Sequence, residues 1–151
     1  MDLINIYWSK FLEGKENKET FRYGGEISFG TDEYSSAELT ALVLSGRKSA
    51  SVSALEAFKI DNETLPKAGV YYVLTDWNEK PCAVIKTENV QVLPYNEVTW
   101  EMAQKEDSSS SMEEWRYNHN LAFEDDAAVM GYDFTPDMPV VYEEFRVVYR
   151  Q

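Results

Sequence analysis

The chain has 151 residues, 44% of them hydrophobic and 14% aromatic, so it is long and apolar enough to fold as a domain with a buried core. Its 27 acidic residues and 14 basic residues give a formal net charge of −13, which disfavours binding to long duplex DNA or RNA. One cysteine excludes an intrachain disulfide, and the sequence has neither a signal-peptide pattern nor an apolar run near the ~18 residues of a membrane helix. These features predict a cytoplasmic protein with no membrane partner.

The first thirty residues predict one helix and little other regular structure. Apolar side chains at helical spacing indicate a helix over residues 2–13 that ends near Gly14 and packs on the rest of the domain. The polar stretch 14–20 is typical of a loop. Two glycines in residues 21–30 favour irregular or extended backbone there.

The clearest helix prediction covers residues 35–46. Ser35 and Glu38 match a capping box, and Gly46 suits the left-handed position after a helix end. A strand is expected to follow over residues 48–53.

Two further strands are predicted in the middle of the chain. Residues 61–69 have turn chemistry, and β-forming runs follow at 71–76 and 82–95. Residues 77–81 supply the turn between these two runs.

The last third of the chain begins with helices. A short helix is predicted over residues 99–106, followed by a polar break at 107–111. Ser111 and Glu114 match a second capping box, which opens a helix through Phe123.

An acidic loop and a strand close the chain. Residues 124–139 contain Gly, Pro and several acids and predict a loop, and residues 139–150 are strongly β-forming. Helices mixed with strands in no regular βαβ order favour an α+β fold, with a mostly antiparallel sheet that is curved or closed into a barrel. No repeat or linker divides the chain, so a single domain over residues 1–151 is expected.

Four segments, in this order, carry a resemblance to a known family: SAELTALVLSGRKSAS, LPKAGVYYVLTDWNEKPCAVIKTENVQVLPYNEVT, SMEEWRYNH and DMPVVYEEFRVVYR. Over about residues 28–150 the chain resembles the ASCH domain family, and most closely its bacterial free-standing branch. This resemblance implies a PUA-like small β-barrel with flanking helices, and a cleft that binds RNA or nucleotides. In one branch that cleft hydrolyses the acyl amide of N4-acetylcytidine.

In the hydrolytic branch the working residues are a lysine in a GRKT-like element, a threonine three positions later, and a glutamate at a helix end. The matching positions here are Lys48, Ser51 and Glu106, with serine in place of threonine. Ser53 stands where an arginine often follows. The resemblance implies that Lys48 takes the proton of Ser51, Ser51 attacks the acyl carbon, and Glu106 protonates the leaving amine or orients Lys48.

Strand geometry constrains this hypothesis. Side chains at positions 48 and 51 of a regular strand point to opposite faces, whereas Ser49, Ser51 and Ser53 share one face. Lys48 must therefore lie in the turn before the strand, or a bulge must intervene. The other interpretation is structural, because cations after a helix and alternating serines are typical of a solvated helix end and a wet strand face.

Six further residues are candidates for ligand contacts, and each also has a structural interpretation. His119 is the one histidine and shares a predicted helix face with Trp115, so it can equally be a partly buried, satisfied side chain. Arg116 can bind an anion or form a surface ion pair, and Trp77 can stack on a base or pack at the rim. The full set of candidates is Arg47, Ser49, Ser53, Trp77, Arg116 and His119.

No cofactor or metal is expected. One Cys and one His do not support a zinc site, and the carboxylates of the acidic loop lack EF-hand order. Cys82 is expected to be a small buried apolar residue.

Three hypotheses about function stay open. The first is binding of a small nucleoside-like ligand or short RNA, with no long duplex as partner, in a cleft lined by Lys48, Ser49, Ser51 and Glu106. The second is an amidohydrolase acting on N4-acylated cytidines. The third is a protein-interaction module whose cleft is vestigial.

Overall fold

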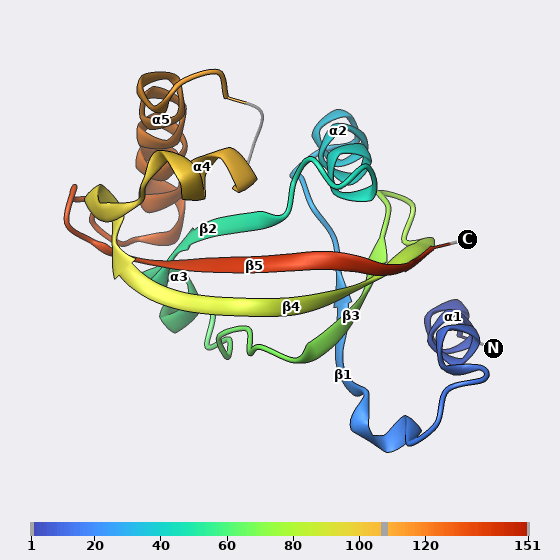
Figure 1. Ribbon diagram of the computed structural model, residues 1–151. Helices are drawn as coiled ribbons and strands as arrows, with labels where there is room; N and C mark the ends of the chain where they lie inside the picture. The colour runs from blue at the N-terminus through green and yellow to red at the C-terminus, as the bar shows by residue number, and fades with distance from the viewer. Residues whose placement is uncertain (1, 107–108, 151) are drawn as a thin grey trace. The chain divides into compact units, whose positions relative to one another are not determined.

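The computed structural model describes residues 2–106 and 109–150, which group into two compact units. Unit 1 comprises residues 2–49, 67–88 and 145–150. Unit 2 comprises residues 50–66 and 89–144, apart from 107–108. Two long strands, β4 (Pro81–Pro94) and β5 (Pro139–Arg150), contribute to both units (Figure 1).

The remaining elements belong to one unit each. Unit 1 holds α1 (Leu3–Leu12), the 3₁₀ turn η1 (Lys18–Thr20), β1 (Arg22–Ile27), α2 (Glu33–Leu44) and β3 (Val70–Thr75). Unit 2 holds β2 (Ala50–Ala54), α3 (Leu55–Ile60), η2 (Tyr95–Glu97), α4 (Trp100–Glu106) and α5 (Met112–Met130).

The strands form one mixed sheet in the order β1-β3-β4-β5-β2. β1 pairs with β3 in parallel, whereas β3 with β4 and β2 with β5 are antiparallel. An α+β fold is therefore confirmed. The expected barrel is not confirmed, because the order of the described strands is open, with β1 and β2 at its two ends.

Unit 1 buries two apolar clusters. Tyr7 and Phe11 of α1 pack against Val73 and Val84 of β3 and β4, as expected for the apolar face of the first helix. Val43 of α2 belongs to the second cluster, whose other buried members are Leu74, Ala83, Ile85 and Phe145.

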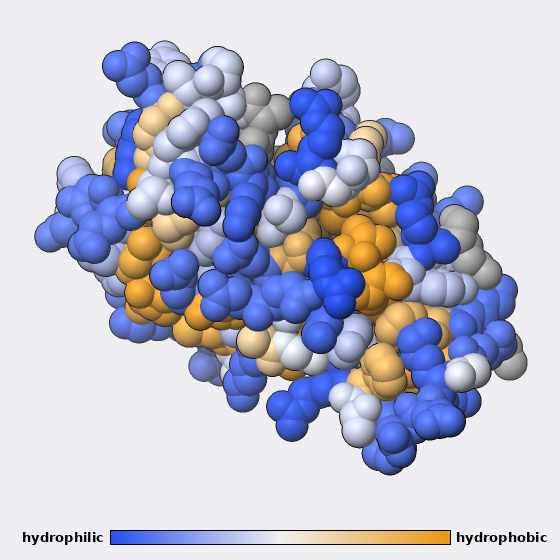
Figure 2. Space-filling view, viewed as in Figure 1, coloured by the Kyte–Doolittle hydropathy of each residue, from blue (hydrophilic) through white to orange (hydrophobic). Residues whose placement is uncertain are grey.

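Unit 2 has a single cluster built around α5. Trp115, at 0% exposure, is the largest fully buried side chain in the described part of the molecule, and Tyr95 stacks against it. The other buried members are Ala54, Val98, Ala103, Phe123, Ala127, Tyr132, Met138 and Val140. Hydrophilic residues cover most of the face drawn in Figure 2, as expected for so acidic a chain.

Several helix boundaries differ from the predictions. Helix α2 begins earlier than expected, because Asp32 is its N-cap and Ser35 occupies the N3 position at the end of the capping box instead of the N-cap position. Helix α5 extends to Met130, seven residues beyond Phe123, because Phe123 and Ala127 continue its buried face. The first seven residues of the predicted acidic loop are therefore helical, and α3 was not predicted at all.

The other predicted elements lie close to their expected positions. β3, β4, α4 and β5 match the predicted strands and helix within two residues at each end. Ser111 caps α5 by accepting a hydrogen bond from the Glu114 amide, as predicted. The polar break lies partly outside the described residues, at 107 and 108. Over the described ranges, no helix combines the length and apolar character needed to cross a bilayer.

Candidate functional site

The Gly-Arg-Lys-Ser turn of unit 1 holds the candidate lysine. Gly46 has φ +80°, which reverses the chain after α2, and the Lys48 amide donates to the Leu42 carbonyl at 3.0 Å. Lys48 therefore precedes β2, which begins at Ala50 and not at the predicted residue 48. This is the turn position that the hypothesis requires of Lys48.

Lys48 is a buried cation. Its side chain is only 5% exposed, and its Nζ lies 5.6 Å from the centre of the Phe29 ring, within cation–π range. Ser49 is half-buried, and its carbonyl accepts a hydrogen bond from the Phe145 amide at 3.0 Å. Arg47, by contrast, is exposed. Lys48 and Ser49 line a shallow hollow of about 270 Å³.

Unit 2 contains a hydrogen-bonded acid–base pair, Glu106 and His119. His119 Nε2 lies 3.0 Å from Glu106 Oε1, and both side chains are about 85% buried, with exposures of 15% and 13%. His119 Nδ1 lies 2.9 Å from the Trp115 carbonyl oxygen. Each ring nitrogen of His119 therefore has an oxygen atom within hydrogen-bonding distance, one from the carboxylate and one from the backbone.

Helix spacing positions this pair. Trp115 and His119 are four residues apart on α5, so they share a face, and their rings stack at 3.9 Å between centroids. Trp115 Nε1 also donates to Glu106 Oε1 at 3.3 Å. The buried indole thus fixes both members of the pair.

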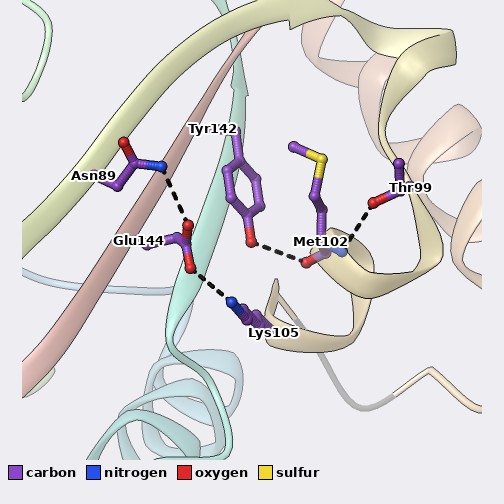
Figure 3. A network of polar contacts seen from close by, with 6 residues as sticks. All are labelled: Asn89, Thr99, Met102, Lys105, Tyr142 and Glu144. Atoms are coloured by element: carbon purple, nitrogen blue, oxygen red, sulfur yellow. Dashed lines mark hydrogen bonds and ion pairs between the residues drawn. The ribbon is translucent and has the colours of Figure 1, made fainter.

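A polar network attaches α4, whose last residue is Glu106, to β5 (Figure 3). Lys105 Nζ lies 2.9 Å from Glu144 Oε2, and Asn89 donates to the other oxygen of that carboxylate at 3.3 Å. The Lys105 hydrogen bond holds the pKa of Glu144 below its ordinary value.

The same network also fixes the first turn of α4 (Figure 3). The Tyr142 hydroxyl donates to the Met102 carbonyl at 3.2 Å, and the Met102 amide donates to Thr99 Oγ1 at 3.2 Å. Burial, with nearby acids, raises the pKa of Tyr142, so it stays a neutral donor.

A hollow of about 410 Å³ in unit 2 brings two candidate residues together. Ser53 of β2 and His119 of α5 both line it, with Asp126 at its rim and apolar side chains between them. Asp126 accepts a hydrogen bond from the Tyr132 hydroxyl at 2.5 Å. Ser51, opposite Glu143 in the β2–β5 register, is half-buried and is not among the lining residues.

Arg116 forms hydrogen bonds within the protein. Its guanidinium donates to the carbonyls of Tyr95 at 2.7 Å and Val98 at 2.8 Å, and it lies over the Tyr95 ring at 4.6 Å. These contacts join α5 to η2. Two of its donors are therefore committed to the backbone of unit 2.

Two residues of the β3–β4 hairpin differ in exposure. Trp77 lies in the hairpin turn and is 47% exposed. Cys82 is half-buried, its Sγ donates to the Leu74 carbonyl at 3.4 Å, and burial raises its pKa to about 11. A thiol with such a pKa is a poor nucleophile near neutral pH.

The sequence did not predict a ligand-binding role for two residues that lie at these candidate sites. Phe29 contacts the Lys48 ammonium, and Asp126 borders the Ser53 hollow. Asp126 was assigned to a solvated loop, and only the longer α5 places it on the His119 side of the helix. Within the described ranges, His, Cys, Asp and Glu form no group arranged to hold a metal ion.

Fold and site together define a small α+β protein with a mixed five-stranded sheet, a buried lysine and a buried acid–base pair. The family model for the ASCH domain matches residues 25–149. The chain belongs to the ASCH domain family, as the sequence predicted.

Solved structures agree with this assignment. The ASCH domain from Lactobacillus crispatus JV V101 superposes with a TM-score of 0.88 at 27% identity, covering 99% of this chain and 96% of that one. A protein from Enterococcus faecalis V583 gives a TM-score of 0.78 at 31% identity, covering 96% and 87%. A search of curated proteins found no match.

Proposed function

We propose that this ASCH protein binds a nucleoside, a nucleotide or a short single-stranded RNA. The observation that carries the proposal is the Glu106–His119 pair, fixed beside the hollow that Ser53 lines. Ser53 and Asp126 line this hollow with His119, and a hydroxyl and a carboxylate offer a donor and an acceptor to the polar edge of a nucleobase. The volume of about 410 Å³ is within the range of small-molecule sites.

Lys48 is proposed to contribute the cationic contact to the ligand. A lysine side chain that is only 5% exposed is uncommon, and buried ionisable groups concentrate at functional sites. Ser49, Ser51 and Arg47 belong to the same chain segment and are proposed as accessory contacts. The overall negative charge favours a ligand with few phosphates over long RNA.

Hydrolysis of N4-acylated cytidine is the second candidate, and the 3.0 Å distance between Glu106 Oε1 and His119 Nε2 favours it, because a carboxyl group next to an imidazole can act in acid–base catalysis. In the proposed reaction Lys48 acts as the neutral amine, and Ser51 Oγ bonds to the acyl carbon while its proton passes to the Lys48 Nζ atom. The C–N bond then breaks as Glu106 protonates the departing amine of cytidine. Glu106, now a carboxylate, takes a proton from water, and the resulting hydroxide attacks the acyl carbon. The bond to Ser51 Oγ then breaks as Lys48 returns its proton to that oxygen, and the acyl group leaves as a carboxylic acid.

Binding and turnover are tested with the same variants. We expect Lys48→Ala and Glu106→Gln to weaken binding of cytidine or a labelled tetranucleotide at least about tenfold, the loss of one charge-assisted hydrogen bond. Isothermal titration and fluorescence anisotropy measure this. Lys59→Ala and Glu113→Gln are matched controls, because both residues are exposed, and they should bind like the wild type.

Loss of the acyl group from N4-acetylcytidine, followed by chromatography, decides between the two candidates. Turnover that Ser51→Ala abolishes supports the hydrolase, whereas binding without turnover supports the binding protein. No binding at about 10 mM ligand and no turnover would overturn both and leave the interaction-module hypothesis.

A further inference from the structure

A second hollow, of about 330 Å³, lies entirely within unit 1 and plays no part in the proposed function. Its walls come from the end of β1, the loop at residues 28–30, the first turn of α2, the end of β3 and the β3–β4 turn. We propose that it binds a small organic cation bearing N–H donors, namely a primary ammonium or a guanidinium group.

Ser36 shows that this hollow has an unused hydrogen-bonding group. Its side chain is 1% exposed, it lines the hollow, and its Oγ has no hydrogen-bond partner. A buried hydroxyl without a partner costs about 1–3 kcal/mol, so such groups call for an explanation. A ligand N–H donor would satisfy it.

The charges of the residues that line the hollow determine whether it favours a cation or an anion. Glu26, Asp76 and Glu79 contribute three carboxylates, and none of the described lining residues is Lys or Arg. Trp77, at 47% exposure, adds an aromatic face of the kind that attracts cations. Acids and an open indole together favour a cation over a phosphate.

The N-terminus of α2 is already capped and does not offer a site for an anion, which would contradict a cation-binding hollow. Asp32 caps the helix, accepting from the Ser35 amide at 2.7 Å, and the Ser36 amide already donates to the Asp32 carbonyl at 2.9 Å. The Asp32 carboxylate therefore occupies the positive end of the helix dipole. Hydrogen bonds from the Ser35 and Tyr34 amides lower the pKa of Asp32, so it stays ionised.

Hydrogen bonds hold the β3–β4 turn in one conformation, with Trp77 and Glu79 beside the hollow. The Asp76 side chain accepts from the amides of Asn78 at 2.9 Å and Lys80 at 3.0 Å through Oδ1. The Asp76 amide donates to the Lys80 carbonyl at 2.9 Å, which closes the hairpin. Trp77 and Glu79 are thus held on a closed turn.

Agmatine, which has one ammonium and one guanidinium group, is the probe. We expect calorimetric titration to show binding that weakens as NaCl rises from about 20 to about 200 mM. Ser36→Ala should lower the affinity about tenfold, and Trp77→Ala should do the same. Glu106→Gln should leave it unchanged, which separates this site from the proposed function.

Thr40→Val is the matched control. Thr40 is also on α2, and its hydroxyl is also buried without a partner, but it does not line the hollow, so agmatine affinity should change less than about twofold. Tetramethylammonium, which has no N–H, should bind more weakly than agmatine. If Ser36→Ala fails to fold, the exposed Trp77→Ala tests the same site.

Three results would overturn the proposal. One is no agmatine binding at about 10 mM. The second is binding that Ser36→Ala and Trp77→Ala leave unchanged. The third is preferential binding of inorganic phosphate.

Discussion

Gly30 is the residue at which the loop after β1 meets helix α2. A Cβ built there would lie 2.6 Å from the Ser36 Cα and in direct collision with the Ser36 amide nitrogen, and the residue has φ +89°. Gly46 has a similar φ of +80°, but a Cβ there would meet nothing within 4 Å. Substitutions at the two glycines therefore distinguish the cost of a steric collision from the cost of backbone strain.

We predict that Gly30→Ala lowers the free energy of unfolding by about 2–4 kcal/mol, because it adds overpacking against helix backbone to the cost of a left-handed alanine. Gly46→Ala should cost only about 1–2 kcal/mol, from the backbone alone. Urea unfolding followed by circular dichroism measures both. If the two variants lose the same free energy of unfolding, α2 shifts away from the added Cβ without cost, and the loop does not need the close contact between Gly30 and Ser36.

At this scale the sequence identified residue types but not their surroundings. The glycine after α2 and the serine before α5 were predictable because the αL conformation and the N-cap each require specific chemistry. The burial of Lys48 and Ser36 was not, because it depends on strands and loops distant in the sequence. Lysine and serine are also most often exposed, so residue type alone predicts exposure at both positions.

Arg116 links two elements of unit 2, since its guanidinium on α5 bonds the carbonyls at both ends of η2. We predict that Arg116→Met lowers the stability by about 2–3 kcal/mol, because two charge-assisted hydrogen bonds are lost while the apolar stem is kept. Arg116→Lys should recover only part of this, since one ammonium cannot reproduce the planar fork. Thermal unfolding measures the loss.

Ligand titration of the same variants tests the earlier assignment of Arg116 to the ligand. If Arg116 acts through structure, the folded Arg116→Lys protein should bind cytidine like the wild type. A variant with normal stability and weakened binding would contradict the structural role.

At the scale of elements, strongly periodic segments were predictable and packing-dependent ones were not. β3 and β4 were found because their β-forming runs flank clear turn residues. α3 was missed because six residues after a strand give too little periodicity. Glu106 and His119 were named separately, but their contact depends on how α4 packs against α5, which the sequence does not encode locally.

For the whole molecule, the mixture of helices and strands predicted the α+β class, whereas the family resemblance implied a barrel, which the open order of the described strands does not confirm. Alternation within a strand reports which face is buried and not which strand is its neighbour. The parallel pairing of β1 with β3 likewise could not be read from β1, a segment with two glycines.

The net charge of −13 makes a prediction about the whole chain. Acids outnumber bases 27 to 14, so 13 carboxylates exceed the number of available cations, and self-repulsion destabilises the folded state. Raising NaCl from about 10 to about 150 mM shortens the Debye length from about 30 to about 8 Å, which screens this repulsion. We expect the Tm to rise by about 2–5 °C, equivalent to about 1 kcal/mol.

The double variant Glu124→Gln and Asp125→Asn is the control, because it removes two adjacent exposed charges on α5. It should raise the Tm at low salt and reduce the salt dependence, since less repulsion remains to be screened. Differential scanning calorimetry at pH 7 measures both proteins. A Tm that falls with added NaCl would instead mean that pairs such as Lys105–Glu144 and Arg146–Glu88, which salt weakens, outweigh the unpaired acids.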